Sequence, residues 1–277
     1  MVESLKIDFG INQRTVPTLR FSEFLELAAD LGCAGVEARN DLGRAIFDGL
    51  SPRTAAKHVS DRGLRLLGLS EVYPFDDWTQ RTRSAVRHLI DIAFEAKAET
   101  ISLIPRVDGG GPADGDVESL YREIVYDIAS WCPPEVVPLI EPIGFSHCSI
   151  RKQRTAARAI EGASAGGKIG ILHDTFQHTL AADGDYLVDH IKLVHLSGAS
   201  VSLPDLNDAH DSERGFVDEN DRTSVIPQIR RLLNDGYDGA FSFEVTSAAV
   251  QTVGDPAQNL RRSMDYLVRA LDSDDGH

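Results

Sequence analysis

IGILHD, residues 169–174, is an apolar run of strand length that ends on a carboxylate, Asp174. Three further runs have the same form: VVPLIEP at 136–142, IKLVHLS at 191–197 and GAFSFEV at 239–245, which carry Glu141, His195 and Glu244 toward their downstream ends. In a (β/α)8 barrel the downstream ends of all strands open onto one face, where the active site is built. The four side chains would meet there, and together they predict a carboxylate-rich site for a divalent metal ion.

The rest of the chain alternates between short apolar runs and amphipathic stretches of helical period, which is the pattern of repeated βαβ units. Earlier strands are expected at 5–11, 34–39, 64–70 and 100–105. Helices are expected near 21–31, 52–60, 79–98, 117–130, 151–162 and 185–190, from 225 onward, and along a last apolar stripe from Leu260 to Leu271. Eight such pairs without a composition break predict an α/β fold, a single-domain (β/α)8 TIM barrel over residues 1–277, with a frayed tail at 272–277.

Two loops that follow predicted strands are unusually long. The Gly-, Pro- and Asp-rich segment 107–116 is long enough to act as a lid, and a plain solvent loop is an equal alternative. The polar segment 200–222 is either a functional loop or a disordered insert.

The composition disfavours several kinds of partner. With 43 acidic and 28 basic residues the chain carries a formal charge of −15, which repels phosphate backbones and anionic membranes, so we expect neither a nucleic acid nor a membrane as partner. No apolar run approaches the roughly 18 residues of a membrane span, and the N-terminus lacks a signal-peptide pattern. The three cysteines have no paired spacing, which fits a reducing compartment. We expect a cytoplasmic protein, and a homo-oligomer is possible.

Each of the four strand-end residues also has an ordinary interpretation. An isolated glutamate at a strand end is more often solvated or ion-paired than catalytic, and a lone core histidine is more often hydrogen-bonded than a ligand. Carboxylates are costly to bury, however, so Glu141 and Glu244 need a cation, a metal or a hydrogen-bond network. The shared position of all four in their units therefore favours the metal site.

The motifs around these residues resemble those of the xylose-isomerase-like TIM-barrel superfamily, the sugar phosphate isomerase/epimerase family. The shared motifs are Ile-Glu-Pro at 140–142, His-Asp-Thr-Phe at 173–176, Val-His-Leu-Ser at 194–197 and Ser-Phe-Glu at 242–244. Within the superfamily the chain resembles the inosose (2-keto-myo-inositol) isomerase group most, through 72–75 with Trp78, 141–145, 208–210, 221–222 and 236–239. The resemblance covers essentially the whole chain.

The resemblance implies a function and assigns roles to residues. The family's metal ligands correspond to Glu141, Asp174, His195 and Glu244, which would hold one divalent ion, Mn, Co, Zn or Mg. Glu141 and Glu244 would also be the catalytic acid and base. The implied substrate is a small keto-polyol or ketose, most of all an inosose, isomerised by proton transfer through a metal-stabilised enediolate.

Other activities on this fold remain open. A ketose 3-epimerase or an inosose dehydratase would begin with the same proton abstraction. An endonuclease-IV-like hydrolase and an inactive sugar-binding barrel are less favoured.

Gln177 departs from the family's pattern, which usually has histidine three residues after the strand-six aspartate. An amide can exchange hydrogen bonds with a sugar hydroxyl, but it is a poor metal ligand and cannot relay a proton as an imidazole does. The substitution disfavours a multi-metal nuclease site and leaves catalysis less certain than binding.

Further substrate contacts are predicted near the barrel mouth. Each has a structural alternative, such as an ion pair across the mouth or aromatic packing between barrel and helix. A solvated position is the expectation for Arg214. The predicted contacts are Gln177, Arg222, Glu37, Arg39, Tyr73, Phe75, His147 and His210.

Overall fold

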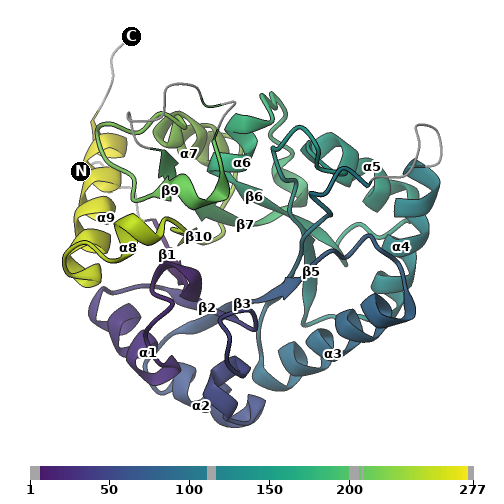
Figure 1. Ribbon diagram of the computed structural model, residues 1–277, viewed down its shortest axis with the longest axis horizontal. Helices are drawn as coiled ribbons and strands as arrows, with labels where there is room; N and C mark the ends of the chain where they lie inside the picture. Colours follow the sequence, from purple (N-terminus) through teal and green to yellow (C-terminus); the bar gives the residue numbers. More distant parts are fainter. Residues whose placement is uncertain (1–6, 111–116, 200–205, 207–208, 274–277) are drawn as a thin grey trace.

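The computed structural model describes residues 7–110, 117–199, 206 and 209–273. Within these residues eight parallel strands form a closed barrel in the order β1-β10-β7-β6-β5-β4-β3-β2, seen end-on in Figure 1. The prediction of a single-domain (β/α)8 barrel is confirmed, because every predicted strand lies in it. The strands are β1 (Phe9–Asn12), β2 (Gly35–Arg39), β3 (Arg65–Val72), β4 (Thr100–Leu103), β5 (Val137–Ile140), β6 (Gly170–Asp174), β7 (Ile191–Leu196) and β10 (Phe241–Phe243).

Helices form a ring around the barrel (Figure 1). The sequence begins α2 with a capping residue: the Ser51 hydroxyl accepts a hydrogen bond from the Thr54 N–H, and Pro52 is the first residue of the helix. The helices are α1 (Phe21–Asp30), α2 (Pro52–Ser60), α3 (Gln80–Ala96), α4 (Val117–Trp131), α5 (Gln153–Gly162), α6 (Thr175–Leu180), α7 (Val225–Asn234), α8 (Ala248–Gln251) and α9 (Pro256–Asp272).

The two ends of the described chain meet where the barrel closes. β1 pairs in parallel with β2 on one side and with β10 on the other. The last helix, α9, also joins the two ends of the chain: its Arg261 donates a hydrogen bond to the Asp30 carbonyl at the end of α1. The first and last βα units thus complete one ring.

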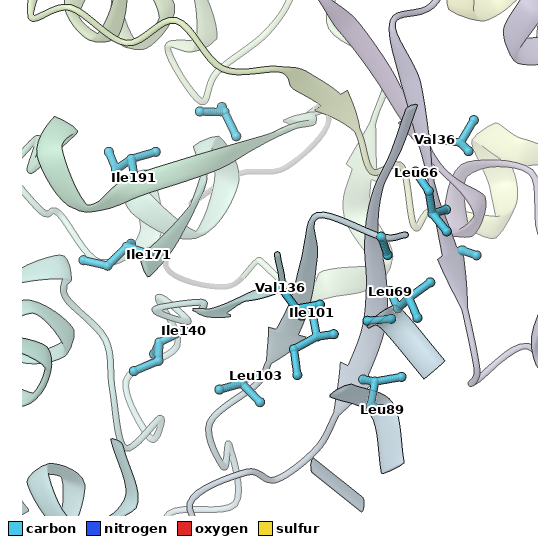
Figure 2. Close-up of a cluster of buried hydrophobic side chains, with 14 of the residues drawn as sticks. Val36, Leu66, Leu69, Leu89, Ile101, Leu103, Val136, Ile140, Ile171 and Ile191 are labelled. Carbon is cyan, nitrogen blue, oxygen red and sulfur yellow. The ribbon is translucent and has the colours of Figure 1, made fainter. Parts of the chain in front are cut away.

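Side chains alternate between the two faces of each strand, which produces two apolar layers. Outward-facing residues pack against the helices, and Figure 2 shows part of this layer, with Val36 from β2 and Ile101 from β4 among the labelled side chains. A second, smaller cluster fills the barrel: Leu67, Leu139, Leu172, Leu193 and Ala240.

Two glycines make room for this inner layer. A Cβ on Gly10 would lie 2.5 Å from the Leu67 Cδ1, and a Cβ on Gly35 would lie 2.8 Å from the Leu67 Cγ. Both contacts are too short for real atoms, so β1 and β2 need glycine where the Leu67 side chain crosses the barrel.

The structure also differs from the predictions in its shorter elements. The helical link expected at 185–190 is reduced to a 3₁₀ turn at Val188–His190, and the helix between β6 and β7 is instead α6, which the pattern did not predict. Within the loop 200–222, β9 (Arg214–Gly215) pairs antiparallel with β8 (Gly198–Ala199), which lies just before the loop. The predicted loop tips at 111–116, 200–205 and 207–208 and the tail at 274–277 lie outside the described residues.

No helix in the described part of the chain combines the length and the apolar character that a bilayer crossing requires.

Candidate metal centre

The alternation of side chains places the four predicted ligands one layer above the leucines of the barrel. Leu172 and Asp174 face inward on β6, and Leu193 and His195 face inward on β7. Leu139 precedes Glu141 by two residues in the same way. The period of two that fills the barrel with leucine therefore also directs the ligands to its downstream mouth.

The four side chains converge in the structure. One donor atom from each of Glu141, Asp174, His195 and Glu244 lies within 4.8 Å of the others, and all four residues are buried. Buried carboxylates need compensating positive charge. This spacing suits a divalent cation, which would draw the four donors inward to coordination distance.

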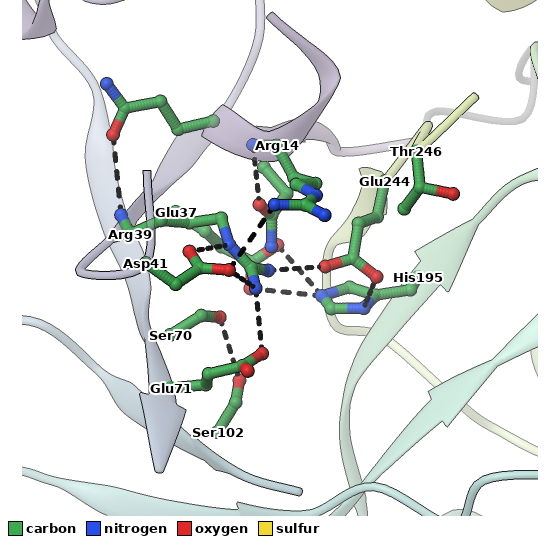
Figure 3. A network of polar contacts seen from close by, with 12 residues as sticks. Arg14, Glu37, Arg39, Asp41, Ser70, Glu71, Ser102, His195, Glu244 and Thr246 are labelled. Atoms are coloured by element: carbon green, nitrogen blue, oxygen red, sulfur yellow. Dashed lines mark hydrogen bonds and ion pairs between the residues drawn. The ribbon is translucent and has the colours of Figure 1, made fainter. Parts of the chain in front are cut away.

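His195 is held in the orientation that a metal ligand requires. Its Nε2 lies 3.1 Å from both carboxylate oxygens of Glu37, which also accepts a hydrogen bond from the Ser242 hydroxyl. Figure 3 shows His195 contacted by Glu37 on one side and by Glu244 on the other. A carboxylate behind the histidine fixes its tautomer, with the proton on Nε2.

The opposite nitrogen of His195 supports the metal site directly. Nδ1 is buried, lies at ion-pair distance from Glu244 Oε2, 3.1 Å, and 3.9 Å from Asp174 Oδ2, and has no partner of hydrogen-bond geometry among the described residues. A buried polar atom without a hydrogen bond is rare, and here it faces two carboxylates across the cluster. The residues present therefore fit a divalent ion bound by Nδ1 and the three carboxylates.

Two arginines reach into the cluster from different sides. Arg39, at the end of β2, donates from Nη1 to Glu244 Oε1 at 2.7 Å. Arg214, at the start of β9, donates from Nη2 to Asp174 and, at 2.7 Å, to Glu244 Oε2. The expectation that Arg214 is solvated is wrong: its side chain is 3% exposed, because the loop after β7 folds back over the barrel mouth.

The surroundings shift the pKa values of Glu141 and Glu244 in opposite directions. Burial raises the pKa of Glu141 well above its usual range, and the charges of Glu244 and Asp174 add to this. Burial opposes ionisation of Glu244 as well, but His195, Arg214 and Arg39 outweigh it and hold its pKa well below the usual range. The site therefore contains one carboxyl group that tends to keep its proton and one that tends to lose it.

A cavity of about 270 Å³ opens above the cluster and has room for a small ligand. Its wall combines charged groups with a few apolar side chains. The lining residues are Arg14, Arg39, Asp41, Glu71, Tyr73, Ile104, Val107, Glu141, Ile143, Phe145, Gln177, Asp211, Arg214, Glu244 and Thr246.

The predicted substrate contacts divide into two groups. Gln177, Arg39 and Tyr73 line the cavity, and Tyr73 is 49% exposed at its mouth. Five others do not line it. Glu37 is buried behind His195, Phe75 lies in the core, His147 stacks on Phe145 with ring centroids 5.9 Å apart, and His210 and Arg222 lie in the loop after β7.

Gln177 lies on α6, the helix that begins next to the metal cluster. Asp174 caps this helix by accepting, at Oδ1, a hydrogen bond of 2.8 Å from the Gln177 N–H, while its Oδ2 faces the cluster. The Gln177 side-chain carbonyl accepts from the Gly144 N–H at 3.0 Å. The Gln177 NH₂ group is then the end that faces the cavity and can donate to a ligand.

Several cavity residues escaped the sequence analysis. Glu71 could have been found, because it follows the apolar run 64–70 in the same strand-end position as the predicted ligands. Asp211, Arg214 and Thr246 lie in loops that show no periodicity, so nothing in the sequence marks them.

Comparisons with known proteins agree with this architecture. The family model described as xylose isomerase-like TIM barrel matches residues 25–270. No curated protein sequence matches the chain. A solved xylose isomerase domain containing protein from Salmonella typhimurium shares 26% identity, with 98% of this chain and 99% of that chain covered and a TM-score of 0.85.

Two more distant structures show the same fold. The IolI protein, solved with a bound zinc atom, is 12% identical, with 96% and 98% of the two chains covered and a TM-score of 0.82. An L-ribulose 3-epimerase is 15% identical, with 96% and 95% covered and a TM-score of 0.72. The match over most of the chain, together with the buried Glu/Asp/His/Glu cluster, leads to one conclusion: this protein belongs to the xylose isomerase-like TIM barrel family.

Proposed function

We propose that the protein is a divalent-metal-dependent isomerase of a small keto-polyol, with an inosose as the first candidate substrate. The observation that carries the proposal is geometric: Glu141 and Glu244 belong to the buried four-residue cluster and also line the cavity above it. Two carboxyl groups that meet both a metal and a ligand suit the roles of acid and base in a proton transfer.

The chemistry needs a proton removed from the carbon beside a ketone. A bound divalent ion would supply Lewis acidity at the substrate oxygens. Glu244 and Glu141 both line the cavity, and in this proposal Glu244 accepts the proton and Glu141 donates one. A proton returned to the neighbouring carbon gives an isomer.

The cavity suits a neutral polyol in size and in chemistry. About 270 Å³ accommodates a six-carbon ring, and the Gln177 amide can donate to a ring hydroxyl. Ile143 and Phe145 provide apolar surface for ring carbons.

The proposal is tested by proton NMR of keto-inositols and ketohexoses in deuterated water with metal-loaded protein. We expect exchange of the proton beside the ketone together with a positional isomer. The Glu244→Gln variant, with its metal content measured in the same sample, should lose about 10²–10⁴-fold in exchange rate, the usual contribution of a general base. Glu99→Gln, a control at the opposite end of the barrel where Glu99 pairs with Arg65 at 2.6 Å, should exchange normally.

Other outcomes have distinct meanings. A product inverted at the same carbon would identify an epimerase, and loss of water would identify a dehydratase. The proposal fails if Glu244→Gln exchanges as fast as the wild type, or if no ketone in the panel exchanges at all.

A further inference from the structure

Beside the metal cluster, one guanidinium holds three carboxylates. Arg39 donates to Asp41 through Nε and Nη2, at 2.7 and 2.9 Å, to Glu71 through Nη2 at 2.7 Å, and to Glu244 through Nη1 at 2.7 Å. Figure 3 shows Glu71 and Glu244 on different sides of this guanidinium. Asp41 also pairs with Arg14 at 3.5 Å, and Glu244 also pairs with Arg214 at 2.7 Å, so a proton is favoured most on the carboxylate that has no second arginine among the described residues.

Glu71 is the carboxyl group of the three best placed to carry that proton. Asp41 is bound bidentately and Glu244 is also bound by Arg214, whereas Glu71 has Arg39 as its side-chain partner among the described residues. Burial raises the pKa of Glu71, the Arg39 charge opposes this, and the charges of Asp41 and Glu244 add to it.

Glu71 also reaches the cavity. It lies at the downstream end of β3, lines the same cavity as Glu141 and Gln177, and its side chain is 23% exposed. A proton on this carboxyl group is therefore within the space where a substrate would sit, and it is separate from the four candidate metal ligands.

Moving a ketone by one carbon requires two proton transfers. One takes the proton from carbon to carbon, which the proposed function gives to Glu141 and Glu244. The other takes a proton from the neighbouring hydroxyl to the former ketone oxygen. The Gln177 amide cannot make this second transfer, because it neither gains nor loses a proton near neutral pH.

We propose, resting on the proposed function, that Glu71 is the acid/base group that carries the proton between the two substrate oxygens. Its O–H bond breaks as the proton goes to the ketone oxygen, which becomes a hydroxyl. Its carboxylate then takes the proton of the neighbouring hydroxyl, whose C–O bond becomes the new ketone. One substrate carbon is reduced and its neighbour oxidised, so no external oxidant or reductant is needed, and Glu71 ends as it began.

The test separates the two transfers with the Glu71→Gln variant, which keeps an oxygen that can accept from Arg39. Exchange of the carbon-bound proton with deuterated water should stay within about threefold of wild type. Formation of the positional isomer should fall about 10²–10⁴-fold. Glu71→Asp, which retains a carboxyl group, should recover part of the isomerisation.

A second readout is the pH dependence of the ratio of the isomerisation rate to the exchange rate. The groups that face Glu71 are Arg39, Asp41 and Glu244. Because the step begins from protonated Glu71, the wild-type ratio should fall as pH rises through its raised pKa. The same ratio, measured for the Glu71→Gln variant, should not fall over this pH range.

Asp41→Asn is the matched variant, since it removes a carboxylate from the same guanidinium but keeps Glu71. Because the charge of Asp41 adds to the raised pKa of Glu71, this variant should still isomerise, with the fall in the ratio shifted to lower pH. The inference is overturned if Glu71→Gln lowers both rates equally, or leaves both unchanged. Wild-type protein that exchanges no substrate proton overturns the proposed function itself, which is a different result.

Discussion

His195 has two ring nitrogens with contrasting surroundings. Nε2 faces the Glu37 carboxylate, whereas Nδ1 faces the candidate metal position without a hydrogen bond among the described residues. A histidine with one nitrogen anchored in this way loses little orientational freedom when the other nitrogen binds a metal. Glu37 is therefore a positioning residue, and its burial behind His195 explains why it does not line the cavity.

Replacing Glu37 with glutamine should weaken metal binding without removing a ligand. The neutral amide attracts the Nε2 proton less strongly and stabilises the ligand orientation less, so we expect a 10–100-fold rise in the dissociation constant for Zn²⁺ or Mn²⁺. Titration calorimetry measures it, with Glu99→Gln as the control. An unchanged constant would contradict the orienting role.

At the scale of single residues, the sequence predicted the four candidate metal ligands better than the residues around them. Asp174 and His195 could be found because an inward-facing position near a strand end depends on the strand period alone. Arg214 could not, since its burial depends on a loop that folds back onto the barrel. Glu71 obeyed the strand-end rule, but its importance depends on sharing Arg39 with Glu244, and the Arg39–Glu244 contact joins residues 205 positions apart in the chain.

At the scale of elements, α6 connects the metal cluster to the segment after β5. Asp174 caps α6, and the Gln177 side chain of α6 binds the Gly144 N–H. The helix spans six residues, Thr175–Leu180, which is too short for a helical period to show in the sequence. The long helices α1, α3 and α9 were predicted because two or more turns of apolar residues face the barrel.

The close contact at Gly144 predicts that a methyl group there displaces α6. A Cβ would lie 2.2 Å from the Gln177 carbonyl oxygen and 2.7 Å from the Leu180 Cβ. We expect Gly144→Ala to lower the free energy of unfolding by about 1–3 kcal/mol and to weaken metal binding, because Asp174 moves with the helix. Urea denaturation and calorimetry measure the two effects.

Gly184→Ala is the control for this substitution, since a Cβ there meets nothing within 4 Å. It should leave both stability and metal affinity nearly unchanged. Equal behaviour of the two variants would show that α6 is not held tightly against Gly144.

At the scale of the whole molecule, the barrel fold was predictable because strand and helix patterns alternate in eight units along the chain. The elements α6, β8, β9 and α8, which the patterns did not predict, lie in the segments that follow β6, β7 and β10. Such loops differ among barrels of one fold because they form the binding site and contribute little to the core.

The net charge of −15 leads to a prediction about nucleic acids. Electrostatic repulsion should prevent binding to duplex DNA, with or without an abasic site, at about 150 mM salt. Fluorescence anisotropy with a labelled duplex should show no change up to micromolar protein. Binding that weakens steeply as salt is added would instead support a nuclease-like activity.

The inner leucine layer limits the routes by which a small molecule can reach the cavity. Leu67, Leu139, Leu172 and Leu193 fill the barrel beneath the candidate ligands, and Gly10 and Gly35 let Leu67 reach across it. The interior is thus a plug rather than a channel. Within the described residues the leucines close the cavity from below, so in the proposed reaction a substrate would enter and its product would leave by the mouth that Tyr73 borders, and each product molecule would delay the next substrate.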